Sequence, residues 1–287
     1  MHFTESAFPA YGLTRPAGPA LPLIADSPHS GTTYPADFDV CIPMGILRTA
    51  EDTYVDELWS AIPDVGGTLL SANFPRTYID ANRDVTDIDP GLLAEPWPDT
   101  LMPTEKSTLM GHGLLWKNVR DTPIYDRKLW VGEVLNRIGT YYQPYHHTLR
   151  EQLDAAHAEF GCVWHLNLHS MPSDTFELLG VAPSERLADF VLGDLDGTSC
   201  DPTLTGIVED FLTEAGYTVA RNLPFKGATL VEQHGKPAAR RNSLQIEINR
   251  KLYMNESSFE KNADFDRLKA SLDDLCLHIA QFIREML

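Results

Sequence analysis

The segment from Cys162 to Met171 carries two imidazoles and an amide on one side of a predicted strand. Its apolar residues alternate with His165, Asn167 and His169, and successive side chains of a strand point to opposite faces of a sheet. One face is therefore expected to meet the core, whereas each buried polar group on the other face needs a partner. We interpret His165 as a hydrogen-bonded interior residue. We interpret His169 as a site residue, because open α/β sheets bind ligands at the carboxyl ends of their strands.

A second histidine follows the end of another predicted strand. The apolar run Leu21–Ala25 leads into the polar turn Asp26–Thr32, which contains His29. A catalytic zinc needs only three protein ligands and an open position, so two such histidines and one carboxylate would suffice. The sequence holds 10 histidines, however, and a histidine in a loop is commonly a surface residue, so spacing alone does not select the ligands.

Two carboxylates lie in segments with a clear pattern. Asp52 falls within residues 48–62, whose apolar spacing predicts an amphipathic helix, and with Thr49 it could form a helix cap. Glu247 falls on the polar stripe of Ser243–Arg250, whose alternation predicts another strand. Solvated acidic side chains are the ordinary alternative for both, so the residues alone do not assign either one to a site.

The segment Pro75–Asp84 holds two arginines that could bind an anion. Arg76 is expected to share one face of an extended segment with Asp80, and Arg83 follows Asn82 beyond the last apolar residue. Guanidinium groups bind carboxylates through two parallel hydrogen bonds. Surface salt bridges with neighbouring aspartates are the alternative, and the spacing leaves both interpretations open.

Helices and strands alternate along the chain, which predicts an α/β class with a mostly parallel sheet. Further strands are expected at 68–71 and 217–220. Helices are expected at 126–158 with a break at Pro144, at 202–215 with Asp201 as N-cap, and at 258–285. Loops are expected at 86–123, 194–200, 222–228 and 233–237. One domain over residues 1–287 is the default for this length, although two small ones are possible, with an irregular lead-in at 1–20.

Composition limits the classes of partner. The chain has 287 residues, of which 43% are hydrophobic, and carries 41 acidic against 23 basic residues, for a formal net charge of −18. Nucleic acids and anionic membranes are bound through basic surfaces, so neither is expected as a partner. An anionic small-molecule substrate would be repelled at long range, and its pocket must therefore supply its own arginines.

The four cysteines are widely spaced and form no Cys-x-x-Cys pair, which favours a reducing, cytoplasmic compartment. We identify no signal-like N-terminus and no apolar run near the roughly 20 residues that a transmembrane helix needs. The His-Glu-x-x-His and Gly-x-Ser-x-Gly motifs, the P-loop and the dinucleotide fingerprint are also missing. No pattern indicates the oligomeric state.

Several short motifs, taken in order, resemble those of the N-formylglutamate amidohydrolase family. They are Ser27-Pro28-His29-Ser30-Gly31, Glu51-Asp52-Thr53-Tyr54-Val55-Asp56, Arg76 through Asn82-Arg83, Leu168-His169-Ser170 and Gln245-Ile246-Glu247, with further agreement at Gln143–His146, Thr198–Pro202, Phe225–Gly227 and Tyr253-Met254. Each motif is short, but their shared order over residues 21–256 is fairly specific.

The resemblance implies a fold similar to that of the zinc carboxypeptidases, a mixed sheet flanked by helices, with one zinc per chain. It implies that His29, Asp52 and His169 bind the metal. The implied reaction is hydrolysis of an N-acyl amino acid, foremost N-formyl-L-glutamate, to the acid and the free amino acid.

The same resemblance implies roles for the other polar residues. Glu247 would take a proton from water and return it to the leaving amine. Arg76 is the candidate for stabilising the oxyanion, and Asn82 and Arg83 would hold a substrate carboxylate. His234 joins the substrate-binding candidates.

The chain also departs from the family pattern. Asn167 stands where members often have Asp, and Pro224–Ala228 and Glu232–His234 stand where many have Arg-Phe-Lys-Gly-Gly and Thr-Arg-His. Two alternatives therefore stay open: a hydrolase of another N-acyl amino acid or short peptide, and a metal-free ligand-binding protein on the same fold.

Overall fold

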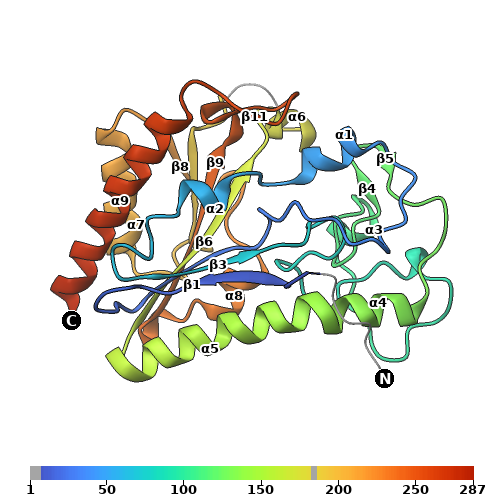
Figure 1. Ribbon diagram of the computed structural model, residues 1–287, viewed down its shortest axis with the longest axis horizontal. Coiled ribbons are helices and arrows are strands. Elements are labelled where there is room, and N and C mark those ends of the chain that lie inside the picture. The colour runs from blue at the N-terminus through green and yellow to red at the C-terminus, as the bar shows by residue number, and fades with distance from the viewer. Residues whose placement is uncertain (1–7, 182–185) are drawn as a thin grey trace. The chain divides into compact units, whose positions relative to one another are not determined.

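The computed structural model describes residues 8–181 and 186–287 of the chain (Figure 1). Within these residues, the chain divides into two compact units. Unit 1 contains residues 8–12, 28–53 and 71–149, and unit 2 contains residues 13–27, 54–70 and the described residues from 150 onward. Residues 1–7 of the expected lead-in lie outside the described residues. The expectation of one catalytic domain stays a prediction.

Unit 2 is built on a mixed, mostly parallel sheet, which confirms the predicted α/β class with flanking helices. Within the described residues the sheet has seven strands in the order β1-β3-β2-β6-β9-β7-β8, and the unit boundary falls within β1 and β3. The strands are β1 Tyr11–Thr14, β2 Leu23–Ser27, β3 Thr68–Ala72, β6 Val163–Met171, β7 Phe190–Gly193, β8 Val219–Arg221 and β9 Arg241–Asn249. β6 is parallel to β2 and β9, and β7 is parallel to β8 but antiparallel to β9.

One face of this sheet is apolar and forms the main core of unit 2. Leu166 and Leu168 of β6 and Ile246 and Ile248 of β9 are fully buried in one cluster with residues of three helices. These are α2 (Val55–Leu58), α7 (Pro202–Glu214) and α9 (Phe265–Met286), and Figure 1 shows α7 and α9 packed side by side. The alternation in the sequence therefore identified the core-facing residues of both strands correctly.

The other face is polar and follows the register of β6 and β9. His165 lies opposite Ser243, Asn167 opposite Gln245 and His169 opposite Glu247. The short helix α8 (Thr229–His234) packs against these two strands, although a loop was expected at 233–237.

The helices and turns of unit 2 agree with the sequence in part. Asp201 accepts a hydrogen bond from the Thr203 amide and caps α7, and Gly216 ends the helix with a φ of 92°, as expected. The C-terminal helix was predicted from residue 258 but begins at Phe265. The remaining short elements are α6 Thr175–Leu178, η4 Pro237–Ala239, η5 Arg250–Leu252, β10 Met254–Asn255 and β11 Glu260–Lys261.

The amphipathic helix predicted at 48–62 is wrong. The chain forms α1 (Met44–Leu47), a 3₁₀ turn over Arg48–Ala50, and then a separate α2. Tyr54, between the turn and α2, has a φ of 69°, which no helix interior adopts. Asp52 is not a cap, because Tyr54 is the N-cap residue of α2 and makes no side-chain cap hydrogen bond.

The rest of unit 1 has few regular elements before residue 131. Within the expected loop at 86–123 lie η2 Pro90–Leu92, α3 Glu105–Thr108 and the strand pair β4 Asn118–Val119 and β5 Thr122–Pro123. The chain is then helical through α4 Val131–Arg137, a π-helical segment at Ile138–Tyr142 and α5 Gln143–Phe160. Pro144 therefore does not break the helix. It follows the π-helical segment, where the hydrogen-bonding pattern changes.

Truncating a side chain on the apolar face of the sheet should lower the stability of the protein. Ile246→Ala should lower the free energy of unfolding by about 2–5 kcal/mol, because the side chain is fully buried between β9 and the covering helices. Leu277→Ala is the control, since Leu277 on α9 is 57% exposed and should change stability by less than about 0.5 kcal/mol. Urea unfolding measures both, and equal effects would contradict the assignment of this core.

Candidate metal centre and its surroundings

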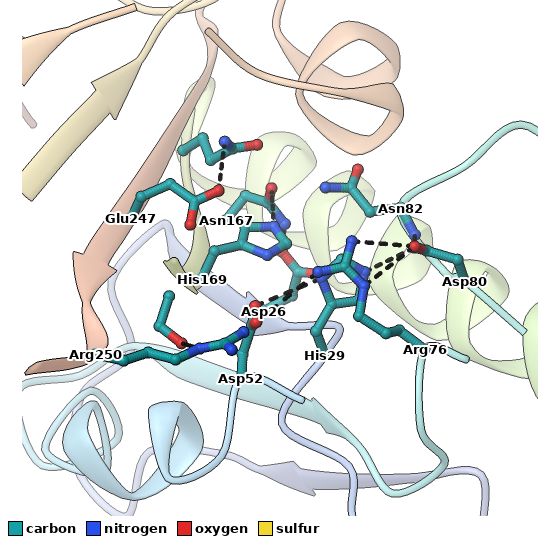
Figure 2. Close-up of polar contacts among 12 residues, drawn as sticks. Asp26, His29, Asp52, Arg76, Asp80, Asn82, Asn167, His169, Glu247 and Arg250 are labelled. Carbon is teal, nitrogen blue, oxygen red and sulfur yellow. Dashed lines mark hydrogen bonds and ion pairs between the residues drawn. The ribbon is translucent and has the colours of Figure 1, made fainter. Parts of the chain in front are cut away.

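In unit 1, His29 lies just beyond the end of β2 and is held by two carboxylates. Its Nε2 is 2.7 Å from Asp80 Oδ1, and its Nδ1 is 3.5 Å from Asp52 Oδ2 (Figure 2). The Asp52 amide also donates to the His29 carbonyl at 3.0 Å, so the two backbones are joined directly. All three side chains are at most 1% exposed. The loop histidine of the sequence is therefore a buried residue between two acids.

A close backbone approach fixes the turn that carries His29. A Cβ added to Gly31 would lie 2.3 Å from the Phe74 carbonyl oxygen, so no other residue fits there without displacement. The Thr33 amide donates to the Asn73 carbonyl beside it. The Ser27–Gly31 motif is thus pinned against the residues that follow β3.

Asp80 accepts hydrogen bonds from several polar groups of unit 1. Its carboxylate accepts hydrogen bonds from Arg76 Nη2 at 3.1 Å, Trp116 Nε1 at 3.0 Å and the Asn82 amide at 2.9 Å, in addition to His29. Complete burial opposes ionisation, but the electrostatic interactions with His29, Arg76 and Arg83 outweigh it and hold the Asp80 pKa well below its usual range. The expected extended segment at 75–84 is a turn instead, and the Arg76–Asp80 pair is buried rather than a surface salt bridge.

The two candidate arginines are both fixed in place. Arg76 stacks on the Trp116 ring at 4.8 Å and lies 3.8 Å from Asp52 Oδ1. Arg83 donates to the carbonyls of His112 and Asn82 at 2.9 and 2.8 Å. Because its donors are already ordered, each guanidinium loses little conformational freedom when it meets an anion.

His112 is a neighbour that the sequence analysis did not select. Its ring stacks on the ring of Trp116, with centroids 4.1 Å apart. Burial, followed by the charges of Arg76 and Arg83, lowers the His112 pKa to about 4. The imidazole is therefore neutral at pH 7.

In unit 2, the polar face of the sheet brings His169 and Glu247 together. They occupy paired positions on the parallel strands β6 and β9, whose backbones run about 4.8 Å apart. Glu247 is 7% exposed and accepts a hydrogen bond from Gln245 Nε2 at 3.1 Å. His169 Nε2 lies 2.8 Å from Asn167 Oδ1. Glu247 is therefore not a solvated residue of an edge strand.

Three more residues of unit 2 belong to the surroundings of His169 and Glu247. His165 bonds Asp26 and Ser243 through its two ring nitrogens, which confirms it as a satisfied interior residue. His234, at the end of α8, lies edge-on to His165 with ring centroids 5.8 Å apart. The sequence analysis missed Arg250, a guanidinium only 4% exposed whose Nε donates to Ser170, the residue after His169.

His29, Asp52 and His169 each offer one ligand atom, and these atoms lie within 4.8 Å of one another. The donor set of two imidazoles and one carboxylate is that of catalytic zinc sites. In both histidines Nε2 faces an oxygen, Asp80 Oδ1 or Asn167 Oδ1, so Nδ1 is the ring nitrogen that could bind a metal. The chemistry of these residues therefore fits a metal ion.

These features define an α/β protein with a candidate metal centre of two histidines and an aspartate. Comparison with known families is more specific. The chain belongs to the N-formylglutamate amidohydrolase family, whose model matches residues 21–254.

Individual relatives agree with this membership. A solved structure of an N-formylglutamate amidohydrolase from Ralstonia eutropha JMP134 is 56% identical, with a TM-score of 0.96 over 98% of this chain and 100% of that one. The N-formylglutamate deformylase of Pseudomonas putida is 29% identical over 245 residues, 83% of each chain. That of Pseudomonas aeruginosa is 28% identical over 249 residues, 85% of this chain and 86% of its own.

Among the described residues, no helix is long and apolar enough to cross a membrane.

The hydrogen bond from Trp116 to Asp80 can be tested by itself. Trp116→Phe keeps an aromatic ring for His112 and Arg76 to stack on but removes a donor to a buried carboxylate, which should cost roughly 1.5–3 kcal/mol of unfolding free energy. Trp130→Phe is the matched control, because Trp130 is 61% exposed. If urea unfolding gives the two variants the same small change, Asp80 does not depend on this donor.

Proposed function

We propose that this protein is a zinc-dependent amidohydrolase that cleaves an N-acyl amino acid, foremost N-formyl-L-glutamate, to formate and L-glutamate. The observation that carries the proposal is the buried group His29, Asp52 and His169, whose ligand atoms lie within 4.8 Å of one another in a chain of this family. The names of its relatives support the same substrate. The substrate is thus a small anionic molecule.

His29, Asp52 and His169 would hold one zinc per chain. When bound, zinc supplies a water of lowered pKa and a Lewis acid for the amide carbonyl. Asp80 and Asn167 fix the two imidazole rings, each through an oxygen that faces Nε2. Such partners of metal-bound histidines typically contribute about 10- to 100-fold in metal affinity or activity.

Glu247 is our candidate for the general base and acid. It would take the proton of the attacking water and deliver it to the nitrogen of the leaving amino acid. Its pairing with His169 across β6 and β9 supports this role, because a proton acceptor must lie near the metal ligands to reach their water. Gln245 donates to one Glu247 oxygen and orients the carboxylate.

The arginines are our candidates for binding the negative charges of the substrate. Arg83, together with Asn82, would hold the α-carboxylate and so align the scissile bond. Arg76 would stabilise the oxyanion, where loss of a single donor typically costs about 2.7–4 kcal/mol of barrier. His234 remains a candidate for the substrate side chain.

Metal removal is the direct test. Protein purified without chelator should contain about one zinc per chain, lose activity when the metal is removed, and regain it when zinc is restored. Elemental analysis and an assay of formate release measure both. A metal-free preparation with undiminished turnover would contradict the proposal, and a preparation without metal or turnover would favour the ligand-binding alternative.

Glu247→Gln should lower kcat by about 10²–10⁴-fold while zinc content stays at the level of the unchanged protein, because only the proton acceptor is lost. Glu214→Gln, an isosteric change at an exposed residue of α7, is the control and should keep full activity. Loss of zinc together with turnover in the Glu247→Gln protein would instead make Glu247 a ligand.

Substrate preference tests the part assigned to Arg83. Arg83→Ala should lower kcat/KM for N-formyl-L-glutamate by at least about 10-fold, because a charge-assisted hydrogen bond contributes about 1.5–3 kcal/mol. Arg267→Ala, at a residue that is 72% exposed, is the control. A panel of N-formyl and N-acetyl amino acids completes the test, and a preference of the unchanged protein for neutral side chains would point to another N-acyl substrate.

A further inference from the structure

A row of hydrogen bonds runs along the polar face of the sheet from His169. His169 Nε2 lies 2.8 Å from Asn167 Oδ1, and Asn167 Nδ2 donates to Asp26 Oδ1 at 2.8 Å. The same Asp26 oxygen lies 2.8 Å from His165 Nε2, and His165 Nδ1 lies 2.8 Å from Ser243 Oγ. Asp26, His165, Asn167 and Ser243 are all fully buried, and Figure 2 shows Asp26, Asn167 and His169 together.

The carboxylate of Asp26 determines which atoms of this row donate and which accept. An ionised carboxylate accepts hydrogen bonds but cannot donate them. Asn167 must therefore turn its NH₂ group toward Asp26, which leaves its carbonyl oxygen toward His169. Since that oxygen only accepts, the hydrogen between the two residues must be on His169 Nε2.

Without the contact to Asp26, the Asn167 amide would not determine which nitrogen of the His169 ring carries the hydrogen. If Asn167 rotated by half a turn, its NH₂ group would face His169 and favour a lone pair on Nε2, with the hydrogen on Nδ1. A ring in that tautomer has no lone pair on Nδ1 with which to bind a metal. The orientation of the Asn167 amide therefore decides whether His169 is prepared for a metal.

We propose that Asp26 is a positioning residue of the metal centre, which acts through Asn167 to hold His169 in its Nε2–H tautomer. The inference rests on the proposed function only in taking His169 as a metal ligand. His29 receives the same support by direct contact, because Asp80 accepts from its Nε2. Asp80 thus contacts His29 directly, whereas Asp26 acts on His169 only through Asn167.

Asp26→Asn tests the relay. The change keeps size and shape but allows both amides to take either orientation, so zinc affinity should fall by about 10- to 100-fold. Affinity is measured by competition with a chelator, and thermal unfolding of the metal-free protein is measured beside it to separate positioning from folding. Asp210→Asn, at an exposed position of α7, is the matched control and should bind zinc like the unchanged protein.

The reciprocal double variant Asp26→Asn with Asn167→Asp provides the rescue. Position 167 would then accept, through its carboxylate, from His169 and from the amide at position 26. Because His165 and residue 167 contact the same Asp26 oxygen, the NH₂ group at position 26 would also donate to His165 Nε2, and the His165 ring would carry its hydrogen on Nδ1 and donate to Ser243. Every hydrogen bond of the row is kept, and zinc affinity should return to at least the level of the unchanged protein. An Asp26→Asn protein with unchanged zinc affinity, or a folded double variant without rescue, would overturn the proposal.

The tautomer can also be observed without a variant. In the metal-free protein at about pH 8, where an ordinary imidazole is neutral, nitrogen NMR with labelled histidine should find the His169 hydrogen on Nε2. A hydrogen on Nδ1 would overturn the proposal even if the variants fail to fold. Failure of the proposed function looks different, since the unchanged protein would then bind no zinc whatever the tautomer of His169.

Discussion

The parallel register of β6 and β9 is the constraint on which the rest of the structure depends. It pairs nine consecutive residues, from Val163 with Arg241 to Met171 with Asn249. Side chains alternate along a strand, so a slip of one residue would turn every polar group of one strand toward the core. The apolar cluster under α2, α7 and α9 makes such a slip costly. Core formation therefore fixes the same register that places His169 opposite Glu247.

Burial of the Asp80 carboxylate is possible because it meets several hydrogen-bond donors. An unpaired buried carboxylate would cost several kcal/mol, whereas Asp80 accepts from His29, Arg76, Trp116 and a backbone amide. A carboxylate held by several donors cannot rotate, and it therefore fixes the ring that it contacts. The network that makes burial tolerable and the network that orients the imidazoles are consequently the same set of hydrogen bonds.

Local patterns in the sequence predicted the elements whose geometry depends on local residues. A period of two predicted strands at 162–169 and 243–250, which the structure has at 163–171 and 241–249. The start of α7 follows from Asp201 and the proline after it. The helix at 48–62 failed although Val55, Leu58, Trp59 and Ile62 are buried as the pattern requires. Its residues 51 and 52 bond Tyr34 and the His29 backbone instead, and apolar periodicity contains no information about such distant partners.

Because local periodicity contains no information about distant partners, it predicted some residues of the candidate site and not others. The alternation of polar and apolar residues gave the faces of His169 and Glu247, but the pairing of their strands is set by sheet topology, which periodicity does not record. His29 and Asp52 were selected only by the order of the family motifs. Asp26 was missed although a usable signal existed, since it directly extends the apolar run 21–25 and proves to be a residue of β2 with no exposed surface. An acid within a buried strand must have hydrogen-bond donors beside it, so such a residue indicates an ordered polar network more strongly than an acid in a loop.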